Sequence, residues 1–208
     1  MPDPCTEPMR ADCARELGQL FRRYGLDLAA MTPDTADTPF GERTTAGKIF
    51  GASGGVMEAA IRSAYFLLTG QEYPEEKIPA IRGIKGHKEV KLKIGDLEVG
   101  AAVVSGLGNA RKLLDEVRAG RKDIHFIEVM TCPGGCVAGG GQPIGTDTEA
   151  IKARLQALYT IDRDERVRVS HRNESVARLY KEFLGEPLGE VSHHLLHTHY
   201  KKREVTVK

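Results

Sequence analysis

The sequence predicts an α/β fold, in which a mixed sheet is flanked by helices. Two hydrophobic patterns alternate along the 208 residues: apolar residues at helical spacing, and apolar residues at every second position or in short runs. Stretches of the two kinds follow one another along the chain, which is typical of interleaved strands and helices. A chain of this length is long enough to bury a core.

The first third of the chain predicts two helices separated by a loop. Apolar residues at helical spacing predict a helix over 15–30, and two prolines then predict a loop over 33–39. A glycine-rich turn over 51–55 precedes a second helix, expected over 56–68. Gly70 is expected to end that helix, because glycine readily adopts the left-handed conformation found after many helices. The apolar face of the first helix consists of Leu17, Leu20, Phe21 and Tyr24.

The middle of the chain predicts a β-hairpin. Val90, Leu92 and Ile94 alternate with charged residues, and Gly95–Asp96 is a two-residue turn signal before an apolar run over 97–104. The further elements expected are a helix over 109–118, a strand over 124–130, and helices over 148–159 and 175–184.

Composition excludes several classes of function. Lys plus Arg number 30 against 29 for Asp plus Glu, which gives no electrostatic case for nucleic acid. No apolar run approaches the roughly 18 to 20 residues of a membrane helix, and the N-terminus shows no secretory signal. The four cysteines, at 5, 13, 132 and 136, are too unevenly placed for a disulfide framework. They favour a reducing, cytoplasmic location with thiolates free for metal.

The most informative stretch runs from Glu128 to Pro143 and holds two cysteines in a glycine-rich loop. Cys132 and Cys136 are separated by three residues, and five of the eight residues from Gly134 to Gly141 are glycine. Such a backbone can approach a bulky ligand closely. Thiolate sulfur selects iron–sulfur clusters, zinc or copper(I). The loop therefore predicts a site for an inorganic group.

Two other interpretations of this loop are weaker. A structural zinc site needs four ligands, usually in two close pairs, and Cys5 and Cys13 are separated by seven residues. A mobile linker would be expected to carry serine, whereas Pro133 and Gln142–Pro143 stiffen this loop.

The loop resembles the third cluster-binding motif of the iron-only ([FeFe]) hydrogenases. The resemblance extends from about residue 14 to 203, so that 14–203 is expected to be the C-terminal part of the catalytic domain, with 1–13 as an N-terminal segment and 204–208 as a tail. The cysteine loop is its most specific part. The other matching segments are Phe50–Ala60, Gly106–Lys112, Phe126–Met130, Gly185–Gly189 and Ser192–Tyr200.

The resemblance implies an H-cluster, a [4Fe–4S] cube joined through a cysteine sulfur to a two-iron unit that carries carbon monoxide, cyanide and a bridging dithiolate. Cys132 would ligate the cube. Cys136 would ligate it and bridge to the two-iron unit, against which Met130 would pack its polarisable thioether. The implied activity is the reversible combination of protons and electrons to hydrogen. The residues expected to enclose the cofactor are Phe50, Gly51, Gly54, Gly139, Gly140, Gln142 and Pro143.

Two upstream cysteine motifs of the family are not matched. One, of the Thr-Ser-Cys-Cys-Pro type, is absent, and the other, of the Met-Pro-Cys-x-x-Lys type, has at best a remnant at Pro4-Cys5-Thr6. Three explanations follow: a subunit that meets a partner carrying these motifs, a truncated product, or a minimal variant that uses Cys5 and Cys13. The first two are favoured. The expected partners are that subunit or an electron-transfer subunit, with ferredoxin or an NAD(P)H-linked protein as electron donor.

Several other residues are secondary candidates for a functional role. His193, His194, His197 and His199 are interpreted as part of a structural tail anchored by Leu195 and Leu196, rather than as a metal site. Glu128 is either a proton relay or a buried, hydrogen-bonded carboxylate, and the second is favoured. The alternative function is a non-catalytic [4Fe–4S] protein of cluster assembly or electron relay. The run Gly139 to Pro143 favours the hydrogenase, because a two-iron unit needs open, glycine-lined space.

Overall fold

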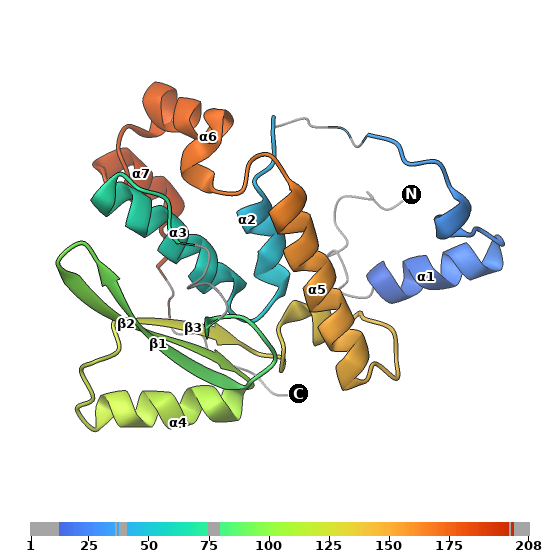
Figure 1. Cartoon of the computed structure of the whole chain (residues 1–208), viewed down its shortest axis with the longest axis horizontal. Helices are drawn as coiled ribbons and strands as arrows, with labels where there is room; N and C mark the ends of the chain where they lie inside the picture. Colours follow the sequence, from blue (N-terminus) through green and yellow to red (C-terminus); the bar gives the residue numbers. More distant parts are fainter. Residues whose placement is uncertain (1–12, 36, 38–40, 75–79, 200, 202–208) are drawn as a thin grey trace.

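The computed structural model describes residues 13–35, 37, 41–74, 80–199 and 201, and it has a three-stranded mixed sheet between helices (Figure 1). Strand β1 (His87–Ile94) pairs antiparallel with β2 (Leu97–Ser105), and β2 pairs parallel with β3 (Phe126–Met130). The predicted hairpin and α/β architecture are confirmed. Gly95 has a positive φ of 59° in the hairpin turn, which glycine adopts without strain.

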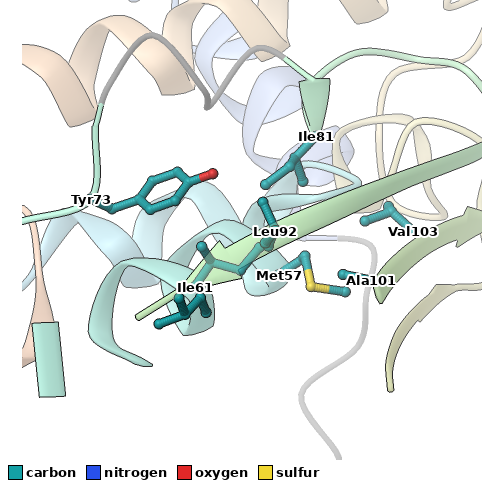
Figure 2. Close-up of a cluster of buried hydrophobic side chains, with 8 residues drawn as sticks. Met57, Ile61, Tyr73, Ile81, Leu92, Ala101 and Val103 are labelled. Carbon is teal, nitrogen blue, oxygen red and sulfur yellow. The ribbon is translucent and has the colours of Figure 1, made fainter. Parts of the chain in front are cut away.

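Helices cover both faces of the sheet. Helix α3 (Gly55–Thr69) lies on one face and α4 (Leu107–Arg118) on the other (Figure 1). Because side chains alternate along a strand, β2 sends Ala102 and Val104 toward α4 and the intervening residues toward α3. Figure 2 shows the core on the α3 side, which comprises Met57, Ile61, Tyr73, Ile81, Leu92, Ile94, Ala101 and Val103.

The ends of α3 follow the predicted signals. Gly54, with φ 99°, precedes its first turn, and Gly70, with φ 71°, closes it by donating its N–H to the carbonyl of Phe66 at 2.8 Å. The other described elements are α2 (Thr45–Lys48), η2 (Ile49–Gly51), η4 (Cys136–Ala138), α5 (Thr148–Asp164), η5 (Ser170–Arg172), α6 (Glu174–Leu179) and the π-helical turn η6 (Tyr180–Leu184).

The N-terminal helix is shorter than predicted. Helix α1 (Cys13–Arg23) ends well before residue 30, because Gly25 turns the chain with φ 64°. Asp27 then caps a separate 3-10 turn, η1 (Leu28–Ala30), by accepting from the N–H of Ala29 at 3.0 Å. None of the helices in the described ranges is long and apolar enough to cross a membrane.

The predicted anchoring of the C-terminal tail by two leucines is wrong. Helix α7 (Glu190–Leu196) leaves Leu195 52% and Leu196 57% exposed. The side chain that α7 buries is Ser192, whose hydroxyl donates to the carbonyl of Glu186 at 2.6 Å. The four tail histidines are exposed, as predicted.

A buried ion-pair network joins α3 to α5. Arg62 donates to the two oxygens of Asp162 at 2.9 and 2.7 Å, and it also pairs with Glu58. Arg82 donates to both oxygens of Glu58, and Arg168 reaches Asp162 at 3.3 Å. Burial raises the pKa of Asp162, but hydrogen bonds and charge from Arg62 outweigh it and hold that pKa below its ordinary value. The network therefore links α3 to α5 through buried ion pairs.

Candidate metal centre

The two cysteines lie in the loop that follows β3. Cys132 is half-buried and Cys136, the first residue of η4, is exposed; both are free thiols. Two tight turns shape the loop: Gly135 donates its N–H to the carbonyl of Cys132, and Gly139 donates to that of Cys136, each at 3.0 Å. Each cysteine is therefore the first residue of a hydrogen-bonded turn, and the two turns follow one another along the chain.

The cysteine loop lies directly on the glycine-rich turn before α3. Gly135 has φ 97°, and a Cβ at this position would lie 2.6 Å from the nitrogen of Ser53 and 2.7 Å from the carbonyl oxygen of Gly51. Only glycine permits this approach. The N–H of Ser53 donates to the carbonyl of Gly134 at 3.1 Å, which fastens the two segments together.

Gly139 packs directly against Cys132, whereas the position of Gly140 is open. A Cβ on Gly139 would lie 3.3 Å from the Cys132 sulfur, which is a tight contact, and a Cβ on Gly140 would meet no atom within 4 Å. The hydroxyl of Ser53 is fully buried with no hydrogen-bond partner among the described residues. Buried polar groups are normally paired. The open position at Gly140, two soft thiols and an unpaired buried hydroxyl all fit an inorganic group with sulfur ligands.

Helix α5 holds the far side of the cysteine loop. Arg154 donates to the carbonyl of Val137 at 2.8 Å and to the hydroxyl of Thr146 at 3.2 Å. From α1, the N–H of Arg15 donates to the carbonyl of Gly141 at 3.0 Å. The glycine-rich stretch is thus fastened at both ends, which is unlike a mobile linker.

Glu128 is a buried, hydrogen-bonded carboxylate, as the sequence favoured. One of its oxygens accepts from the N–H of Gly54 at 2.6 Å and the other from the N–H of Met57 at 2.7 Å. Both oxygens therefore cap the N-terminus of α3. Met130 lies two residues further along β3, on the same face of the strand, and is half-buried.

The structure brings some of the predicted cofactor-enclosing residues together. Gly51 contacts the cysteine loop, with Val137 3.7 Å from a Cβ built on it. Phe50, 45% exposed, lines a separate cavity of 520 Å³ that neither cysteine lines. Gln142 is half-buried and Pro143 is exposed. The roles of these residues toward a cofactor stay predictions.

Four residues of this region were not singled out from the sequence: Ser53, Lys88, Ser105 and Arg154. Lys88 carried a signal, because it continues the alternating register of Val90 and Leu92 and so occupies a core-facing position. Ser105 is buried at the end of β2, and its hydroxyl accepts from the N–H of Gly134 at 3.4 Å. No comparable pattern points to Arg154.

The described part of the chain supplies two cysteine sulfurs and no larger ligand set. Among the described residues, no three Cys, His, Asp or Glu side chains converge. Cys5 lies outside the described residues; Cys13 begins α1, but its side chain is likewise outside them. The residues present fit one side of an iron–sulfur group.

Comparison with known proteins matches most of the chain to two families, both of iron hydrogenase subunits. Residues 13–140 match the family described as iron-only hydrogenase large subunit, C-terminal domain, and residues 148–203 match iron hydrogenase small subunit. The NADP-reducing hydrogenase subunit HndD of Solidesulfovibrio fructosivorans is 48% identical over 191 residues, which are 91% of this chain and 32% of that protein.

A solved structure and a relative of another kind are also similar. A variant of [FeFe]-hydrogenase HydA1 from Chlamydomonas reinhardtii superposes with a TM-score of 0.68 at 39% identity, over 89% of this chain and 53% of that one. The cytosolic Fe-S cluster assembly factor narfl of Xenopus tropicalis is 31% identical over 203 residues, 93% of this chain and 42% of that protein. The chain thus spans about a third to a half of the length of these relatives.

Proposed function

Because the chain belongs to the iron-only hydrogenase family, as the C-terminal domain of its large subunit, we propose that it forms one side of an H-cluster site for the reversible reduction of protons to hydrogen. The observation that carries the proposal is the cysteine loop on the Gly51–Gly55 turn. There Gly139 packs against the Cys132 sulfur, and the position of Gly140 next to it is open. Two thiols in such a glycine backbone favour a cofactor with sulfur ligands that the backbone can approach closely.

In this proposal Cys132 would be a ligand of a [4Fe–4S] cluster, and Cys136 would be a ligand of that cluster and of the two-iron unit. When bound, the cofactor would supply the redox chemistry that interconverts protons and hydrogen. The protein's own contribution is position and exclusion of water. Met130 offers a thioether neighbour, and the buried hydroxyl of Ser53 offers a hydrogen bond. The residues proposed to enclose the cofactor are Phe50, Gly51, Gly54, Gly139, Gly140, Gln142 and Pro143.

The proposed site needs cluster ligands from polypeptide beyond the described residues. The remaining cluster ligands would come from segments that carry the two unmatched cysteine motifs, in a partner subunit or in further chain of the same protein. An electron-transfer subunit, with ferredoxin or an NAD(P)H-linked protein as donor, would supply electrons, and the location would be cytoplasmic. The name of HndD, a hydrogenase subunit, is consistent with such an assembly.

The chain produced alone with the maturation machinery of the family is expected to evolve little hydrogen. Co-production with a polypeptide that carries the two unmatched motifs is expected to restore hydrogen evolution, because that polypeptide completes the thiolate set. Gas chromatography with a chemically reduced electron donor measures both samples. Robust hydrogen evolution by the isolated chain would contradict this requirement and favour a minimal variant that uses Cys5 and Cys13, in which case Cys5→Ser would abolish turnover.

A second candidate function is favoured by one observation. The similarity to an assembly factor of cytosolic iron–sulfur proteins extends over 93% of the chain. In that case the loop would hold only a [4Fe–4S] cluster for cluster assembly or electron relay. The higher identity to HndD and the open position at Gly140 favour the hydrogenase.

A further inference from the structure

Lys88 is a buried lysine on the face of β1 that otherwise carries hydrophobic side chains. Its neighbours on the same face, Val90, Leu92 and Ile94, belong to the core against α3 or pack on it, whereas Lys91 and Lys93 are exposed. Lys88 is only 7% exposed, and burial lowers its pKa to about 8. The negative charge of Glu128 acts in the other direction and raises that pKa, but by less. Burying an ammonium group is costly unless it is well hydrogen-bonded. Its partners therefore indicate what it does.

Lys88 and Glu128 lie in one row across the sheet. In β1, Lys88 is opposite Val103 of β2, and Val103 is opposite Glu128 of β3. The two charged residues are therefore two strands apart, roughly 10 Å between their backbones, on the face toward α3. Val103 lies between them in this row.

The two side chains bind the two ends of a single peptide group. Lys88 Nζ donates to the carbonyl of Ser53 at 3.0 Å, and Glu128 accepts from the N–H of Gly54 at 2.6 Å. That carbonyl and that N–H belong to the same peptide bond, and in a trans peptide they point in opposite directions. Each end is bound by the charge that suits it, cation to oxygen and anion to N–H.

Both side chains also bind a second backbone group that steadies the arrangement. Lys88 donates to the carbonyl of Gly83 at 2.9 Å, and Glu128 accepts from the N–H of Met57 at 2.7 Å. Rotation of the Ser53–Gly54 peptide would break a hydrogen bond to each charged group. Such a rotation would change φ of Gly54, a torsion that glycine restricts less than any other residue.

The orientation of this peptide determines what the turn presents to the cysteine loop. The N–H of Ser53, on the preceding peptide, donates to the carbonyl of Gly134, and Gly135 lies against the backbone of residues 51–53. We propose that Lys88 and Glu128 are positioning residues, a pair that clamps the Ser53–Gly54 peptide from the sheet and thereby holds the cysteine loop in its ligand-binding geometry. What the loop binds rests on the function proposed above, but the clamp does not.

Hydrogen–deuterium exchange of the metal-free chain, followed by mass spectrometry of its peptides, tests the clamp without any cofactor. Lys88→Met and Glu128→Gln are each expected to speed exchange in peptides covering residues 51–57 and 132–139 by at least ~10-fold, because each removes a hydrogen bond to a charged group. Exchange in β2 and α4 is expected to stay unchanged. Lys91→Met, on the exposed face of the same strand, is the matched control and should leave all four segments unchanged.

Alkylation of Cys132 by iodoacetamide gives a second readout in the same variants. The half-buried thiol of Cys132 should react faster in both variants than in the unmodified chain or in Lys91→Met. Unchanged exchange in 132–139 together with unchanged alkylation of Cys132 would overturn the proposal. So would equal acceleration in β2 and α4, because the pair would then stabilise the whole fold and not the loop. A failure of the proposed function would leave these results unaffected, since no metal is present.

Discussion

Replacing Cys132 or Cys136 by alanine is expected to abolish iron incorporation. The two thiols are the soft ligands that the described part of the chain places in the glycine-rich loop. Loss of either one leaves a single thiolate there, which is too few to retain one side of a cluster. After anaerobic reconstitution with iron and sulfide, iron content and the sulfur-to-iron absorption at about 400 nm measure the effect.

Cys13→Ala provides the matched control from the same chain. Cys13 is the first residue of α1 and does not belong to the loop that holds Cys132 and Cys136. Its replacement is expected to leave the iron content unchanged. Full iron and full absorption in Cys132→Ala or Cys136→Ala would show that the cluster is bound elsewhere. Loss of iron in Cys13→Ala would instead favour the minimal variant, in which Cys5 and Cys13 complete the ligand set.

Asp162→Ala is expected to cause the largest loss of stability among single changes outside the cysteine loop. Asp162 is fully buried, and its removal leaves Arg62, 4% exposed, without two of its hydrogen bonds, and Arg168 without one. Removing one partner of a buried ion pair typically costs about 3 to 5 kcal/mol, because the remaining charge stays buried. Urea unfolding of the metal-free chain measures this free energy.

A neighbouring residue and the pH both serve as controls for the Asp162 prediction. Asp164 pairs with Arg163 at the surface, so Asp164→Ala should leave the free energy of unfolding almost unchanged. The pKa of Asp162 is lowered in the folded chain, so its contribution is complete above the unfolded value of about 3.9 and is lost as the pH falls through the folded value. The difference between the unmodified chain and Asp162→Ala should therefore shrink below about pH 4. A difference that is small at pH 7 would contradict this account of the network.

The elements with strong local signals could be predicted from the sequence. The hairpin around Gly95 and the end of α3 at Gly70 depend on backbone conformations that glycine adopts readily, so the sequence marks them directly. The helix over 15–30 was predicted too long, because an apolar period continues past Gly25, where the backbone turns. The prediction that Leu195 and Leu196 are buried is wrong. Two adjacent leucines in a sequence do not indicate whether another helix or strand packs against them.

Some features of the candidate site could likewise be predicted from the sequence, and others could not. The cysteine loop could be found because the ligands and their glycines are adjacent in sequence. The clamp of Lys88 and Glu128 could not, because it depends on the pairing of three strands and on a turn many residues earlier in the chain. The unpaired hydroxyl of Ser53 likewise becomes visible only when its surroundings are known.

The infrared spectrum of the chain, co-produced with a polypeptide that carries the unmatched motifs and with the maturation machinery, tests the central claim most directly. Carbon monoxide and cyanide bound to iron absorb where protein does not, so their bands report the two-iron unit separately from a [4Fe–4S] cluster. The hydrogenase account predicts these bands in the complemented sample and their loss in Cys136→Ala. A sample that contains a full [4Fe–4S] cluster but no carbon monoxide or cyanide bands would contradict it and favour a role in cluster assembly or electron relay.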